Sequence, residues 1–166
     1  MKKYASNILI YIAALFGIVA FVCFFSSPLQ YKDVIKGTWS AYNVKAYVGE
    51  TVQGVTVYKG TSYPIIGFVV PLILSIFLII ESFKPSLSER LTIINSLFAV
   101  LFFISAVLVL LTKELFLSVN GLGEIQTIRN GLGPILSAIC SFFAGIILLI
   151  VTWMPGQEPV DFIETN

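Results

Sequence analysis

Side chains able to do chemistry are scarce in this chain, and most of them lie in one polar stretch, residues 26–63. Histidine, the commonest metal ligand and general base, does not occur in the sequence. The loop carboxylates Asp33, Glu50 and Glu124 lack the spacing of metal ligands. No serine or cysteine nucleophile stands in a motif with its base. The sequence therefore predicts no catalytic, cofactor or metal site, and a protein that is not an enzyme.

Aromatic residues give the polar stretch its main recognition chemistry, because it holds Trp39 and five of the seven tyrosines. Tryptophan and tyrosine are favoured at binding hot spots, so these side chains predict an interaction surface. The competing interpretation is packing within a β-hairpin together with an aromatic belt at a membrane interface. The candidate surface consists of Trp39, Tyr42, Tyr47 and Tyr58.

Two β-prone segments, Thr38–Val48 and Thr51–Tyr58, flank Gly49-Glu50 and predict a hairpin with a type II′ turn. Such a turn requires a positive φ at Gly49. This register pairs Val48 with Thr51, Val44 with Val55 and Tyr42 with Val57. Because a lone hairpin is marginal in water, we expect a third strand or a platform from residues 124–129 and the end of the preceding helix.

Composition places these residues on a membrane protein, since 57% of the 166 residues are hydrophobic, 11% are charged and the mean hydropathy is +0.95. Four apolar runs predict transmembrane helices at residues 8–25, 65–83, 91–112 and 135–154. The third run continues to about residue 119. One continuous helix over residues 91–119 would measure roughly 43 Å, so its last turns would project beyond the bilayer.

The predicted fold is a single all-α membrane domain, a four-helix antiparallel bundle, because the connection at residues 84–90 is too short for any other pairing. The first outer loop, residues 26–63, adds a small extracytoplasmic β-hairpin or sheet, which the second outer loop could join. The lipid bilayer is the first partner. A net charge of +1 and scattered basic residues exclude a nucleic-acid footprint.

Charge distribution predicts cytoplasmic N and C termini in the cytoplasmic membrane. Four basic residues lie within the 14 residues of the inner segments, whereas six are spread over 60 residues of the outer loops. Residues 155–166 then form an acidic cytoplasmic tail.

Small residues recur at four-residue steps in the apolar runs, and such rows let membrane helices approach closely. They could equally mediate contacts between copies. The rows consist of Ser137, Ser141 and Gly145; Gly67 and Ser75; and Ala13 and Gly17. Cys23 and Cys140, inside apolar runs, are small hydrophobes or, alternatively, a disulfide between two helices.

A short repeat, Asn-Gly-Leu-Gly, occurs at residues 120–123 and 130–133. A phosphate-binding loop would need Gly-Lys-Ser/Thr and a strand-to-helix frame, which neither copy has. We therefore interpret both copies as a helix cap and turns.

The layout is similar in outline to that of claudin-type four-helix membrane proteins, with a β-rich first outer loop, a shorter second one and a long third helix. The Trp-Gly-Leu-Trp-Cys-Cys signature of those proteins and any cysteine in the outer loops are missing.

The leading hypothesis for function is a non-enzymatic membrane protein that presents the β-module to a protein partner or to copies of itself. The alternative is a small-solute channel or transporter subunit, which would work as an oligomer because four short helices enclose little space. The apolar runs lack the ionisable groups that pumps and proton relays require.

Overall fold

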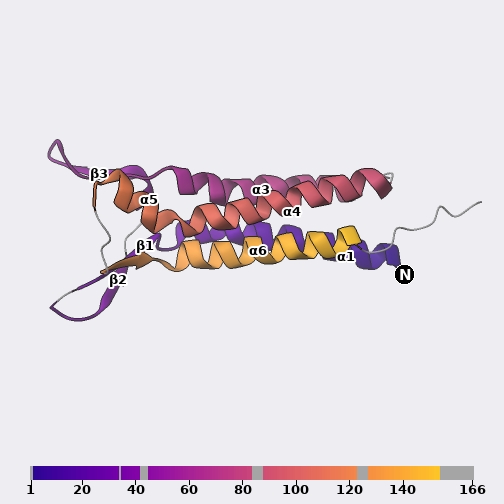
Figure 1. Ribbon diagram of the computed structural model, residues 1–166, viewed down its shortest axis with the longest axis horizontal. Helices are drawn as coiled ribbons and strands as arrows, with labels where there is room; N and C mark the ends of the chain where they lie inside the picture. The colour runs from indigo at the N-terminus through magenta and orange to yellow at the C-terminus, as the bar shows by residue number, and fades with distance from the viewer. Residues whose placement is uncertain (1, 34, 42–44, 84–87, 123–126, 154–166) are drawn as a thin grey trace, which may run out of the picture.

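The computed structural model describes residues 2–33, 35–41, 45–83, 88–122 and 127–153. Four long helices lie side by side along the long axis of the molecule (Figure 1): α1 (Lys2–Val22), α3 (Tyr63–Ser82), α4 (Ser88–Leu110) and α6 (Leu132–Trp153). Each contains a stretch long and apolar enough to cross a membrane. The chain is thus mostly helical with four candidate membrane spans, as the apolar runs predict.

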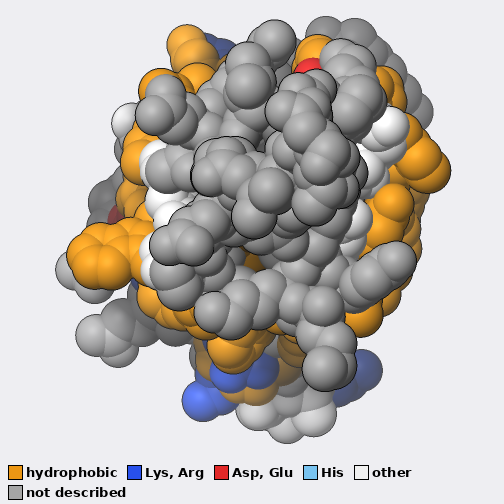
Figure 2. Space-filling view, turned by 90° about the vertical axis from the view of Figure 1, so that its right-hand side faces the viewer, with side chains coloured by type: hydrophobic (Ala, Val, Ile, Leu, Met, Phe, Trp, Pro, Cys, Tyr) orange, Lys and Arg blue, Asp and Glu red, His pale blue; other side chains and the backbone are white. Residues whose placement is uncertain are grey.

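Neighbouring helices run in opposite directions, and each contacts two others: α1 packs against α3 and α6, and α4 packs against the same two. The sheets and a short helix, α5 (Thr112–Val119), lie at one end of this arrangement, which we call the sheet end. The first residues of α1 and the last of α6 lie at the opposite end. Viewed from that opposite end, hydrophobic side chains line the flanks of the helices (Figure 2), as expected for surfaces that face lipid.

Small residues bring the helices close together. A Cβ added to Gly17 of α1 would collide with the Ser75 hydroxyl and lie 2.8 Å from the carbonyl oxygen of Pro71, both on α3. A Cβ on Gly145 of α6 would lie 2.8 Å from the ring of Phe103 on α4. All seven small residues of the predicted rows are buried within one copy of the chain: Ala13, Gly17, Gly67, Ser75, Ser137, Ser141 and Gly145.

Proline and serine shape α3. Pro64 occupies its first turn, where the missing N–H leaves no bond unmade. Pro71 lies inside the helix and is fully buried, and the Ser75 hydroxyl donates a hydrogen bond of 2.7 Å to its carbonyl oxygen.

Cys23 and Cys140 are both free thiols, so the alternative of a disulfide is wrong.

The predicted continuous helix over residues 91–119 is also wrong, because the helix breaks at Leu111, where ψ is 4°. The break separates α4 from α5 and interrupts the ladder of backbone hydrogen bonds. Asn130 supplies the missing partners: its Oδ1 accepts from the Lys113 N–H at 2.9 Å and its Nδ2 donates to the Leu110 carbonyl at 2.6 Å. A side chain from a distant strand therefore stabilises the bend.

Two antiparallel sheets form at the sheet end. The three-stranded sheet has the order β2-β1-β5, from β1 (Leu29–Lys32), β2 (Trp39–Ala41) and β5 (Ile128–Asn130). In it Tyr31 lies opposite both Ser40 and Ile128. The second sheet is the hairpin of β3 (Gly49–Val52) and β4 (Val55–Lys59). The second loop thus contributes a strand, but to the three-stranded sheet and not to the hairpin.

Residues 26–63 do contain a hairpin, but its predicted strands, turn and register are wrong, because the first predicted strand is divided between two other elements. Residues 39–41 pair with β1, and Lys45–Val48 forms a helical turn, α2. The hairpin turn is Gln53-Gly54, with φ of 50° and 79°, the positive values of a type I′ turn. Gly49 does have a positive φ, 95°, but at the start of β3, where its backbone lies against Gly60.

Candidate functional site at the sheet end of the bundle

Elements β1 to β5, α2 and α5 together make the β-module, which extends beyond the helices (Figure 1). A small apolar cluster joins its parts: Leu29 of β1, Ala46 of α2, and Phe116 and Leu117 of α5 are each at most 4% exposed. Because these residues come from three separate stretches of chain, their burial fixes the two sheets to the end of the bundle.

Tyr47 anchors the first loop in the helices. The α2 turn buries its ring to 1% exposure, stacked on Phe24 with centroids 5.3 Å apart and edge-on to Phe68 at 5.8 Å. Burial raises the pKa of the Tyr47 hydroxyl, an effect that the nearby Thr112 side chain opposes. Tyr47 is therefore a packing residue, and its assignment to the interaction surface is wrong.

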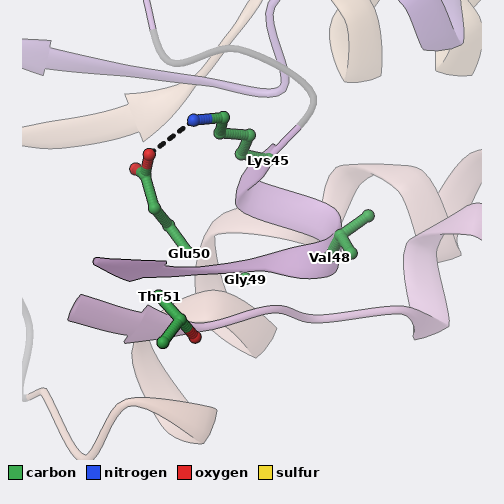
Figure 3. Close-up of a pocket in the computed structure, with 5 residues that line it drawn as sticks. All are labelled: Lys45, Val48, Gly49, Glu50 and Thr51. Carbon is green, nitrogen blue, oxygen red and sulfur yellow. Dashed lines mark hydrogen bonds and ion pairs between the residues drawn. The ribbon is translucent and has the colours of Figure 1, made fainter. Parts of the chain in front are cut away.

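A polar contact joins α2 to the hairpin (Figure 3). The Lys45 ammonium lies 2.5 Å from Glu50 Oε1, and the Tyr58 hydroxyl donates to Glu50 Oε2 at 3.1 Å. The hydrogen bond from Lys45 and then that from Tyr58 lower the pKa of Glu50. Lys45 and Glu50 line an open hollow with Val48, Gly49 and Thr51, and they satisfy each other there. The hollow thus offers no unpaired charge to a ligand.

The first copy of the Asn-Gly-Leu-Gly repeat holds the hairpin to α5. Asn120 ends α5, and its Oδ1 accepts from the backbone N–H of Lys59 at 2.8 Å. Its Nδ2 donates to the Lys59 carbonyl at 3.0 Å and to the Phe116 carbonyl at 2.9 Å. The Tyr58 ring packs edge-on against Phe116, with centroids 5.7 Å apart. One asparagine thereby closes the outer edge of β4 at its last residue.

The rest of the hairpin projects from the module with its aliphatic side chains exposed. Four valines are between 51% and 76% exposed: Val52, Val55 and Val57 of the hairpin, and the adjoining Val48 at the end of α2. The hairpin lies beyond the ends of the long helices (Figure 1). Exposed apolar groups at such a place mark a surface that is available for contact.

Trp39 lies on the exposed face of the three-stranded sheet. Strand register puts Gln30, Lys32, Trp39, Ala41 and Arg129 on this face, which we call the Trp39 face. The Arg129 guanidinium carbon lies 3.9 Å from the centre of the Trp39 ring, and Arg129 Nε donates to Gln30 Oε1 at 2.9 Å. Arg129 therefore crosses over β1 and rests on the tryptophan.

The structure does not bring the four predicted surface residues together. Trp39 is 37% exposed, Tyr58 is half-buried on the hairpin and Tyr47 lies in the core. Tyr42 falls outside the described residues. Sequence reasoning missed Arg129, Asn120 and Asn130 as site residues. The repeated Asn-Gly-Leu-Gly motif was the signal for the two asparagines, whereas nothing in the local sequence connects Arg129 to Trp39.

Neither metal chemistry nor known relatives identify the site. Among the described residues, no three His, Cys, Asp or Glu side chains lie close enough together to hold a metal ion. Comparison of the chain with family models, curated proteins and solved structures gave no match. The four apolar helices are compatible with an integral membrane protein.

Proposed function

We propose that this is a non-enzymatic protein of the cytoplasmic membrane that presents the β-module, outside the cell, to a protein partner or to copies of itself. The four candidate spans and the concentration of basic residues in the inner segments support this location and orientation.

The exposed β3–β4 hairpin is the observation that carries the proposal. Its three valines, and Val48 next to them on α2, are exposed at the sheet end. Burying such a side chain stabilises a contact by about 1.5–3 kcal/mol. The hairpin is held in place by Asn120 and by the packing of Tyr58. Little conformational entropy is therefore lost when a partner binds.

The packed interior does not favour transport through a single copy. Phe68, Phe102 and Leu148 are fully buried between the helices. Glu81 is the only Asp, Glu, Lys or Arg residue within the four described spans. It lies near the end of α3 that is farther from the β-module. An interior filled by such side chains supports a structural role for the helices.

Capture of a partner tests the proposal. Wild-type protein purified from native membranes should retain a stoichiometric protein or form a defined oligomer. Gly49→Val should abolish that association without reducing membrane insertion, because the helices satisfy their own backbone bonds. A variant that keeps its partner at wild-type yield would place the interaction in the helices.

Orientation is tested separately. Lys36 lies exposed in the turn between β1 and β2, so Lys36→Cys should react with an impermeant maleimide on intact cells. Labelling only after the membrane is opened would reverse the proposed orientation. The wild-type protein is the control, since Cys23 is buried and Cys140 lies within a candidate span.

A further inference from the structure

The Trp39 face carries positive charge that the described part of the chain leaves unpaired. Arg129 uses one of its five N–H donors, Nε, for Gln30 and one side of its plane for Trp39. Its four remaining donors have no acceptor among the described residues. The stack on tryptophan holds the guanidinium in place, so its fork is oriented before any ligand arrives.

Lys32 adds a second cation to the same face. It lies directly opposite Trp39 in the register of β1 and β2, and no acid contacts it in the described ranges. Asp33, the next residue, is already used: its Oδ1 accepts from the backbone N–H groups of Ile35 and Lys36 at 2.9 and 3.1 Å. Two cations therefore flank one exposed indole, and no carboxylate of the described residues is in contact with either of them.

The position of β2 determines what shape of ligand fits. β2 is an edge strand of the sheet and pairs only with β1 among the described residues. An extended peptide laid along such an edge extends the sheet, and its alternate side chains then lie over one face. The turn that joins β1 to β2 projects away from the helices (Figure 1), so this edge strand lies at the sheet end, beyond the long helices.

We propose that the Trp39 face binds an acidic, extended peptide segment of a partner protein, with carboxylates on Arg129 and Lys32 and apolar atoms against Trp39. This inference rests on the proposed function and names the chemistry of the partner. The fork of Arg129 matches the two oxygens of a carboxylate, and such charge-assisted bonds are the strong ones. A second copy of the chain would present the same cations, so the charge opposes self-association through this face.

A peptide probe tests the inference on the full chain, held in a bilayer of zwitterionic lipid. In a Trp153→Phe background Trp39 is the sole tryptophan and reports binding by its fluorescence. The probe is an eight-residue peptide of alternating Glu and Val, and its control has Gln in place of Glu. The Glu peptide should change the Trp39 emission and the Gln peptide should not, with affinity falling as salt rises.

Matched variants locate the contact. Arg129→Gln and Lys32→Gln should each weaken peptide binding about tenfold, the usual effect of losing one charge-assisted hydrogen bond. Lys59→Gln removes an exposed charge from the other sheet and should change the affinity by less than about twofold. Arg129→Lys should not restore full affinity, because a lysine lacks the planar fork.

Three results would overturn the inference: equal binding of the Gln peptide, an equal loss in Lys59→Gln, or a Trp39 response to anionic lipid vesicles but not to the peptide. The proposed function is judged by another result. If Gly49→Val loses the natural partner while Arg129→Gln leaves peptide affinity unchanged, this inference fails and the proposed function stands. If the natural partner is held by the helices, the proposed function fails whatever the peptide does.

Discussion

Removing the Asn120 side chain should loosen the hairpin while leaving the helices intact. Asn120→Ala deletes both hydrogen bonds to the Lys59 backbone, of 2.8 and 3.0 Å. Each such bond contributes about 1 kcal/mol net. The edge of β4 should therefore open more easily by about 2 kcal/mol, which corresponds to roughly 30-fold more of the open form.

Amide hydrogen exchange measures that opening one residue at a time. The Lys59 N–H donates to Asn120, so its exchange should accelerate about 30-fold in Asn120→Ala, provided that reclosing is fast. Asn120→Asp keeps the acceptor oxygen and loses the donor, and should give a smaller acceleration. Amides in the middle of α4 should exchange as in the wild type.

Asn130→Ala is the matched control, because this asparagine holds the bend between α4 and α5 through Lys113 and Leu110. Its removal should accelerate exchange at the Lys113 amide and leave that of Lys59 near the wild-type rate. An unchanged Lys59 amide in Asn120→Ala, or equal effects of the two variants on it, would refute the assignment of separate tasks to the two copies of the repeat.

Three further outcomes are expected. Gly49→Val should disorder the hairpin, because φ at this position is 95° and a Cβ would lie 2.8 Å from the backbone nitrogen of Gly60. Gly54→Asn should keep the hairpin, because asparagine suits a type I′ turn and nothing lies within 4 Å of the added Cβ; the chemical shifts of the hairpin amides distinguish the two variants. The pKa of Glu50 is lowered in the folded state, so its contribution to hairpin stability should be complete above the ordinary glutamate pKa and should disappear as pH falls through the lowered value. Glu50→Gln should abolish this pH dependence when amide hydrogen exchange of the hairpin is measured across that range. Gly145→Leu should lower stability by about 1–3 kcal/mol in thermal unfolding, through overpacking against a phenylalanine of α4, whereas the exposed Ile150→Leu should change it little.

The helices could be predicted from sequence because membrane spans follow from length and hydropathy alone. Their ends depend on local signals of the same kind, such as Pro64 in the first turn of α3. The break at Leu111 could not be predicted, since no proline or glycine marks it and Asn130, a residue 17 positions away in sequence from Lys113, stabilises it.

The β-module was less predictable because its pairings are long-range. The β propensity of residues 38–48 predicts one strand, yet tertiary packing of Tyr47 converts its last part into a helical turn. Gly49 has the predicted positive φ, but the reason is its close approach to Gly60 and not a position in the hairpin turn. Arg129 reaches Trp39 only because β5 pairs with β1, a connection between residues about 100 positions apart in sequence.

Site-specific photo-crosslinking in intact cells tests most directly whether the β-module is the surface that binds a partner. A photoreactive residue at Val55, which is 68% exposed on the hairpin, should form a discrete protein adduct in high yield. The same residue at Phe143, 48% exposed on the flank of α6, should react with lipid and give no such adduct. A protein adduct from Phe143 with none from Val55 would contradict the account and assign the interaction to the helices.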